Sequence, residues 1–295
     1  MIGNVSGRPV SALISVLPSA MEVLIYPSAQ AAADQAADRI AEALRRNPRL
    51  VLGLATGSTM EPVYARLVSL HHHTGLDFSG CRTFNLDEYV GLPANHPNSY
   101  RYYMDHHLFR QINIEAARTH LPDGMAPDLA EECVRYEALI TQYGGIDLQL
   151  LGIGQNGHLG FNEPLSPLDS RTHVQLLSAT TRAQNAPHFL PPAQTPAYAL
   201  TMGMGSILAA RRCLLLATGA EKAPVIAEAL EGSRTNRIPA SALQLHPHCT
   251  VILDQLAASR LRQPEIVVPP ARIAAQTGVA AGVSPAVEGG ILPPG

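Results

Sequence analysis

Short apolar runs alternate along this chain with longer stretches in which apolar residues recur at helical spacing. Near the start, the apolar run Met21–Tyr26 precedes the stretch Ala31–Arg46, and a second apolar run, Leu50–Ala55, follows it. Within the middle stretch, the apolar residues that lie three or four positions apart are Ala37, Ile40, Ala41 and Leu44. This spacing predicts a helix, and the flanking apolar runs predict strands that are buried on both faces.

The same alternation continues to about residue 254. Further strand-like segments are 82–85, 147–152, 197–201, 213–217 and 251–254. Helical stretches between them include 61–70, 128–143 and 221–231. Strands that alternate with helices predict an α/β fold built on a parallel or mostly parallel, doubly wound sheet.

The two ends of the chain lack this periodicity. Residues 1–20 carry Gly, Pro and Ser, and residues 263–295 are rich in Pro, Ala and Gly. Such segments bury too little apolar surface to offset the entropy of ordering them. We therefore predict a single α/β catalytic domain over residues 21–262, a flexible extension before it and a disordered tail after it.

The composition narrows the kinds of partner. Of the 295 residues, 46% are hydrophobic and 15% are charged, Trp is absent, and the formal net charge is −3 without any run of Lys or Arg. These features predict an aliphatic core and argue against binding to nucleic acid or to a membrane surface. No apolar run approaches the roughly 20 residues that span a bilayer. We expect a cytoplasmic protein whose partner is a small molecule.

The cysteines and most of the histidines do not form a metal-binding pattern. The four cysteines are widely separated and lack CxxC spacing, which predicts reduced, buried thiols. Neither His71–His73 nor His246–His248 has acidic or cysteine partners at ligand spacing. We predict no catalytic metal.

A loop rich in Gly, Ser and Thr follows the strand-like segment that ends near residue 55. It comprises Thr56, Gly57, Ser58 and Thr59, and the helical stretch 61–70 begins directly after it. Backbone amides and hydroxyls at a helix N-terminus can converge on an anion, so this loop is a candidate phosphate site. An ordinary strand-to-helix turn uses the same residues, and no Walker lysine follows.

Two adjacent carboxylates, Asp87 and Glu88, stand just beyond the segment 82–85. Open α/β sheets bind their ligands at the carboxyl ends of the strands, so one of these residues is a candidate general base. The alternative is a helix cap or a solvated turn. Asn98–Tyr100 offers a separate cap downstream, so a cap is not required of Asp87.

The segment Leu151–Pro164 crowds glycines together with Asn156, His158 and Glu163. Such crowding of Gly and polar residues at a strand end rarely serves packing alone. A His beside a carboxylate can hold one imidazole tautomer and transfer a proton near neutral pH, typically worth about 10²–10⁴-fold in rate. His158 with Glu163 fits this role.

Lys222 lies in a second segment that follows a strand and opens a helix, Thr218–Ala223. Its ammonium could bind a phosphate as a point charge. Taken alone, it would be read as an ordinary surface lysine.

Three longer motifs occur in the order in which one enzyme family has them. They are Asn85-Leu-Asp-Glu-Tyr-Val-Gly-Leu-Pro93, Gly157-His-Leu-Gly-Phe-Asn-Glu-Pro164 and Leu243-Gln-Leu-His-Pro247. From about Met21 to Leu256 the chain resembles the glucosamine-6-phosphate deaminase family. Chance assembly of all three motifs is implausible.

This resemblance implies a modified Rossmann-like, three-layer α/β/α fold and an enzyme of amino-sugar metabolism in N-acetylglucosamine catabolism. The implied reaction converts glucosamine 6-phosphate and water into fructose 6-phosphate and ammonia without an organic cofactor. It also implies that His158 helps to open the sugar ring, with Asn156 and Glu163 orienting it, and that Asp87 moves a proton between C2 and C1. Family members assemble in different ways, so a homo-oligomer is one expected state.

One segment departs from the family pattern. Where the family usually places an Arg before an aromatic pair to bind the phosphate, this chain has Pro187 and His188.

Two other functions stay open. A lactonase resembling 6-phosphogluconolactonase would share the fold, but it typically continues with Ser-Leu-Phe-Pro after its His, whereas this chain has Phe161–Pro164. A sugar-phosphate sensor would carry an added DNA-binding helix-turn-helix, for which residues 1–20 are too short. The intact set of candidate proton-transfer residues favours an enzyme.

Overall fold

A parallel sheet forms the centre of the molecule. The computed structural model describes residues 21–189 and 195–262. The predicted extension, residues 1–20, and the predicted tail, residues 263–295, lie outside them. Within the described residues, seven strands pair in parallel throughout. In spatial order they are β1 (Glu22–Tyr26), β10 (Cys249–Asp254), β9 (Cys213–Ala217), β6 (Leu148–Leu151), β2 (Val51–Leu54), β3 (Arg82–Asn85) and β5 (Thr119–His120).

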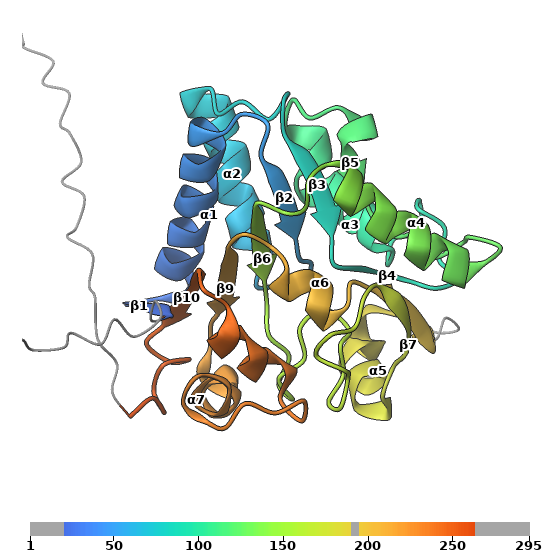
Figure 1. The fold of residues 1–295 in the computed structure, drawn as a ribbon. Coiled ribbons are helices and arrows are strands. Elements are labelled where there is room, and N and C mark those ends of the chain that lie inside the picture. Colours follow the sequence, from blue (N-terminus) through green and yellow to red (C-terminus); the bar gives the residue numbers. More distant parts are fainter. Residues whose placement is uncertain (1–20, 190–194, 263–295) are drawn as a thin grey trace, which may run out of the picture.

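Helices cover both sides of this sheet, and α1 packs against α2 (Figure 1). The α-helices are α1 (Ala29–Arg46), α2 (Glu61–Thr74), α3 (Tyr100–His107), α4 (Leu129–Gln142), α5 (Ala179–Asn185), α6 (Met204–Leu208) and α7 (Ala223–Glu231). The short 3-10 helices are η1 (Phe109–Gln111), η2 (Ala116–Arg118), η3 (Ala186–His188), η4 (Ala220–Lys222) and η5 (Pro239–Leu245). The three-layer α/β/α fold predicted from the sequence is confirmed.

The strands carry the apolar runs that predicted them. Every residue of β2 and of β9 is buried, as expected for parallel strands that are covered on both faces. Ser28 caps the amino end of helix α1, and its Oγ accepts the backbone N–H of Ala31 at 3.2 Å. Its buried face consists largely of alanines, so its backbone can approach the sheet closely. The core is therefore aliphatic, in agreement with the composition.

A second, antiparallel sheet stands beside the main one. It contains β4 (Asp87–Tyr89), β8 (Tyr198–Thr201) and β7 (His173–Leu176), in the order β4-β8-β7. The segment 197–201 was expected in the parallel alternation, and this expectation was wrong. A four-residue apolar strand carries no signal that distinguishes a parallel from an antiparallel neighbour.

Two further expectations concern the described residues. Cys81, Cys133, Cys213 and Cys249 are all free and buried, as predicted. Within the described part of the chain, none of the helices has the length and apolar character needed to cross a membrane.

Candidate active site

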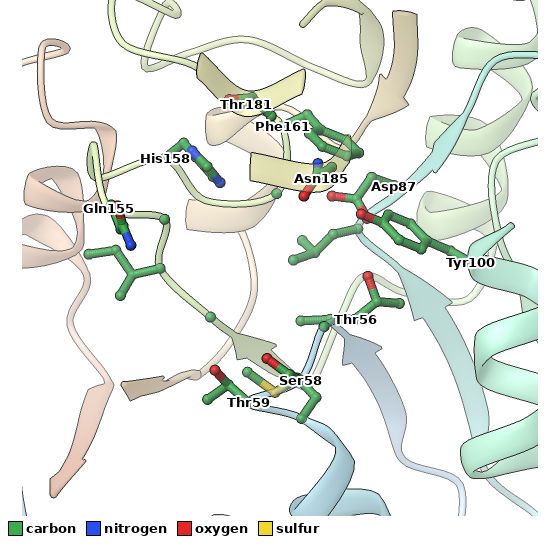
Figure 2. A pocket seen from close by; sticks show the side chains of 18 of the residues that line it. Thr56, Ser58, Thr59, Asp87, Tyr100, Gln155, His158, Phe161, Thr181 and Asn185 are labelled. Atoms are coloured by element: carbon green, nitrogen blue, oxygen red, sulfur yellow. The ribbon is translucent and has the colours of Figure 1, made fainter. Parts of the chain in front are cut away.

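An open cavity of about 450 Å³ lies at the carboxyl ends of four adjacent strands, β9, β6, β2 and β3 (Figure 2). The chain leaves β2 toward β3 on one side and leaves β6 toward β9 on the other, so the cavity lies where the strand order reverses. Ligands of open α/β sheets bind at such switch points. Its lining includes Thr56, Gly57, Ser58, Thr59, Asp87, Tyr100, Gln155, His158, Phe161, Thr181, Asn185 and Lys222.

The candidate phosphate loop forms one wall of this cavity. It connects the end of β2 to α2, and Gly57 has φ of +104°, a conformation that favours glycine. The hydroxyl of Tyr103 in α3 donates a hydrogen bond to the Gly57 carbonyl oxygen at 2.9 Å. This bond anchors the loop, and the amino end of α2, a favourable position for an anion, follows directly.

Asp87 projects into the cavity from the first position of β4. Its side chain is only 6% exposed. Burial, together with the neighbouring Glu88 carboxylate, raises the pKa of Asp87 to about 8. A Cβ on Gly160 would lie 3.2 Å from Asp87 Oδ2, so the glycine leaves room beside the carboxyl. A buried carboxyl whose pKa lies near neutrality can both accept and return a proton.

Glu88 points away from the cavity and binds backbone amides. Its carboxylate accepts the N–H groups of Tyr89 at 2.8 Å and of Tyr100 and Arg101 at 2.9 Å. Tyr100 and Arg101 are the first two residues of α3, after the N-cap residue Ser99. The sequence left open whether this acidic pair supplies a general base or a helix cap. Glu88 caps a helix, and Asp87 faces the cavity, where a general base would lie.

His158 belongs to a chain of hydrogen bonds that ends at Glu163. The Nδ1 atom of His158 lies 2.6 Å from Asn156 Oδ1, and Asn156 Nδ2 donates to Glu163 Oε2 at 3.1 Å. Glu163 Oε1 accepts the hydroxyl of Thr181 in α5. Because Asn156 Oδ1 can only accept, it fixes the proton on Nδ1 and leaves Nε2 free to take a proton from a ligand.

Glycine is required next to the imidazole. A Cβ on Gly154 would lie 2.1 Å from His158 Cε1, so the ring occupies the space that a side chain would fill. Gly157 has φ of +84°, where glycine is favoured. The glycines that marked this segment in the sequence therefore shape the backbone around one imidazole.

The electrostatic surroundings of His158 favour a neutral ring. Burial lowers its pKa, Glu163 opposes this effect, and the charge of Lys222 adds to it. Burial also lowers the pKa of Lys222 itself, while Glu221 counteracts the change. Lys222 lies in the cavity wall at the end of η4, the short helix that follows β9, and its charge reaches His158.

The structure brings all the predicted residues to one place, either in the cavity wall or, for Asn156 and Glu163, one hydrogen bond behind it. The lining residues that sequence reasoning did not single out include Tyr100, Thr181 and Asn185. Tyr100 had been read only as part of a helix cap. Thr181 and Asn185 lie in α5, whose seven residues give little periodicity.

Pro187 lies in η3, directly after α5. The backbone of His188 belongs to the same turn, but its side chain lies outside the described part of the structure. Pro187 is not among the described residues that line the cavity.

Comparison with known proteins agrees with this geometry. Residues 27–252 match the family model of glucosamine-6-phosphate isomerases/6-phosphogluconolactonase. The glucosamine-6-phosphate deaminase of Thermoanaerobacter pseudethanolicus is 44% identical over 253 residues, covering 84% of this chain and 100% of the relative. That of Pseudarthrobacter chlorophenolicus is 49% identical over 242 residues, covering 82% and 93%.

Solved structures show the same fold. A monomeric glucosamine-6-phosphate deaminase superimposes with a TM-score of 0.79 at 45% identity, covering 81% of this chain and 100% of the other. The 6-phosphogluconolactonase from Trypanosoma cruzi has a TM-score of 0.67 at 23% identity, covering 84% and 99%, and shares the fold alone. The chain belongs to the family of glucosamine-6-phosphate isomerases and 6-phosphogluconolactonases.

Proposed function

We propose that this chain is a glucosamine-6-phosphate deaminase, which converts glucosamine 6-phosphate and water into fructose 6-phosphate and ammonia. The observation that carries the proposal is the placement of Asp87 and His158 in the wall of one cavity, at the ends of different strands. The reaction needs two proton-transfer groups, because the C2 proton becomes acidic only after the ring has opened and C1 has become a carbonyl.

His158 opens the sugar ring in this proposal. Its Nε2 takes the proton of the C1 hydroxyl and delivers a proton to the ring oxygen, so that the C1–O5 bond breaks. Asn156 and Glu163 hold the imidazole through the hydrogen bonds of 2.6 Å and 3.1 Å. They also stabilise the positive charge that develops on the imidazole when it takes the proton.

Asp87 then removes the C2 proton while the C1 carbonyl oxygen takes up a proton, and it returns the proton to C1 while the C2 amino group releases one. The resulting imine carbon at C2 is attacked by water, and ammonia leaves. Because Asp87 must be ionised to act as the base and its pKa is raised to about 8, kcat/KM should rise with pH toward that value.

The loop Thr56–Thr59 and Lys222 bind the 6-phosphate. Both line the cavity, and together they offer a helix N-terminus and one ammonium. This arrangement supports phosphate binding without an Arg at the position of Pro187.

Deamination is favoured over lactone hydrolysis. The relatives that are 44–50% identical are glucosamine-6-phosphate deaminases, whereas the lactonase compared above is 23% identical. A cytoplasmic location and a homo-oligomeric state stay predictions, and size-exclusion chromatography with light scattering would test the latter.

The proposal is tested with purified protein and three substrates. We expect ammonia and fructose 6-phosphate from glucosamine 6-phosphate, far less ammonia from unphosphorylated glucosamine, and no hydrolysis of 6-phosphogluconolactone above the uncatalysed rate. Ammonia from neither amino sugar would contradict the deaminase assignment, and lactone hydrolysis alone would replace it.

A further inference from the structure

The buried carboxylate next to Asp87 joins two elements of the active site. Glu88 is 3% exposed, and its hydrogen bonds to the N–H groups of Tyr100 and Arg101 tie β4 to the first turn of α3. A helix N-terminus has free N–H groups and a positive end of its dipole, so it holds a carboxylate well. Burial raises the pKa of Glu88, and these hydrogen bonds oppose the rise.

The first turn of α3 delivers Tyr100 to the cavity wall. The ring of Tyr100 lies 5.0 Å from that of Tyr89 and is nearly parallel to that of Phe161 at 6.0 Å. Its hydroxyl lies close to the side chains of Tyr89 and Thr56. In Figure 2 the Tyr100 hydroxyl points toward Asp87. Tyr100 thus links the carboxyl side of the cavity to the phosphate loop.

We propose that Glu88 is a positioning residue of the reaction, which holds Tyr100 and the start of α3 against Asp87 while its charge acts on the Asp87 carboxyl. The inference rests on the proposed function, because it assigns Glu88 a part in the proton transfer by Asp87. Glu88 itself makes no contact with the substrate, since its carboxylate faces the backbone of α3.

The charged groups around the pair make this effect specific. Apart from burial, the field of Glu88 is what raises the Asp87 pKa. The Asp87 charge also acts on four phenols contributed by α2, β4, α3 and α4, which are Tyr64, Tyr89, Tyr100 and Tyr136. His158 and Lys222 are titratable groups that line the same cavity. Arg101 in α3 acts on Glu88, but its guanidinium is directed to Thr119 and Asp105.

A purely structural role is the competing explanation, and the chain offers a matched control for it. Ser99 caps the same helix end, where its Oγ accepts the N–H of Tyr102 at 3.1 Å. Ser99→Ala removes a capping bond from α3 and a hydroxyl that interacts with Glu88, but it leaves the carboxylate beside Asp87 in place. Glu88→Asp keeps the charge and shortens the side chain, whereas Glu88→Gln removes the charge and turns a donor toward the N–H of Arg101.

The experiment compares kcat and KM of the three variants from pH 5 to pH 9, by ammonia release from glucosamine 6-phosphate. We expect Glu88→Gln to lower kcat by about 10- to 100-fold with a smaller change in KM. A displacement of the reacting groups on the order of 1 Å lowers the rate by about that factor. The acid limb of the pH profile of Glu88→Gln should move to lower pH. Glu88→Asp should lower kcat and keep the wild-type pH profile, and Ser99→Ala should lower Tm and leave the profile in place.

Three outcomes would overturn the proposal. Wild-type kinetics in both Glu88 variants would do so, as would equal losses in Glu88→Gln and Ser99→Ala without any shift of the pH profile. A second readout needs no turnover. The decline of wild-type stability with rising pH ends near the folded-state pKa of Asp87, so it should end at a lower pH in Glu88→Gln, and an unchanged end point is the third contrary outcome. Absence of ammonia release by the wild type would instead contradict the proposed function.

Discussion

Replacement of Asp87 by Asn should make the folded protein more stable, and increasingly so as the pH rises. The unfolded chain releases this proton near pH 4, whereas burial keeps it bound in the folded protein up to about pH 8. Between these values the folded state binds more protons than the unfolded state, so each pH unit lowers the free energy of unfolding by about 1.4 kcal/mol. Asn cannot ionise, and the variant escapes this loss.

The difference between variant and wild type should therefore grow by about 3–4 kcal/mol from pH 5 to pH 8 and level off above that range. This is a large part of the roughly 5–15 kcal/mol that stabilises a typical domain. Burial of the Asn amide has its own cost, but that cost does not depend on pH and cancels from the slope.

Urea unfolding at pH 5, 6, 7 and 8, followed by far-UV circular dichroism because the chain has no Trp, measures this slope. Asp34→Asn is the matched control, since Asp34 lies on the surface of α1, where it accepts a hydrogen bond from Gln30. It removes a carboxylate from a helix surface instead of from the cavity. A constant difference between Asp87→Asn and wild type, or one that shrinks with pH, would refute the reasoning.

Three further variants test the other side of the cavity. His158→Gln should lower kcat by about 10²–10⁴-fold on the closed sugar. A substrate analogue supplied in the open-chain form should partly escape the defect. Equal losses of kcat on both substrates would refute the ring-opening role. Gly154→Ala should lower kcat by about 100-fold with little loss of Tm, because its Cβ would lie 2.1 Å from His158 Cε1; activity at the wild-type level would mean that the ring position is unimportant. Lys222→Ala should raise KM for glucosamine 6-phosphate by about 10- to 100-fold, as expected for a hydrogen bond to a charged group, and an unchanged KM would remove Lys222 from the phosphate site.

Much of the main sheet could be predicted from the sequence, because its strands are continuous apolar runs between helices whose apolar residues recur at regular spacing. The carboxyl ends of those strands meet at one edge, so Asp87, His158 and Lys222 could be assigned to one site without coordinates. The small sheet was not foreseen, since β4 is a three-residue strand that includes both acidic residues. Its existence depends on pairing with β8, which is far away in sequence.

The separate roles of Asp87 and Glu88 could not be predicted either. Adjacent residues of a strand point to opposite faces, but which face meets the cavity depends on the pairing of β4 and on the position of α3. Likewise, Tyr100 gave the sequence signal of a helix start, and its second role in the cavity wall comes from the tertiary placement of that helix.

The most direct test of the central claim, that Asp87 transfers a proton in a cavity shared with His158, is the release of ammonia and fructose 6-phosphate by wild type and Asp87→Asn side by side. We predict equal amounts of the two products from the wild type and about 10²–10⁴-fold less of both from the variant, with binding of glucosamine 6-phosphate largely retained in calorimetry. Near-normal turnover by a folded Asp87→Asn protein would contradict the account.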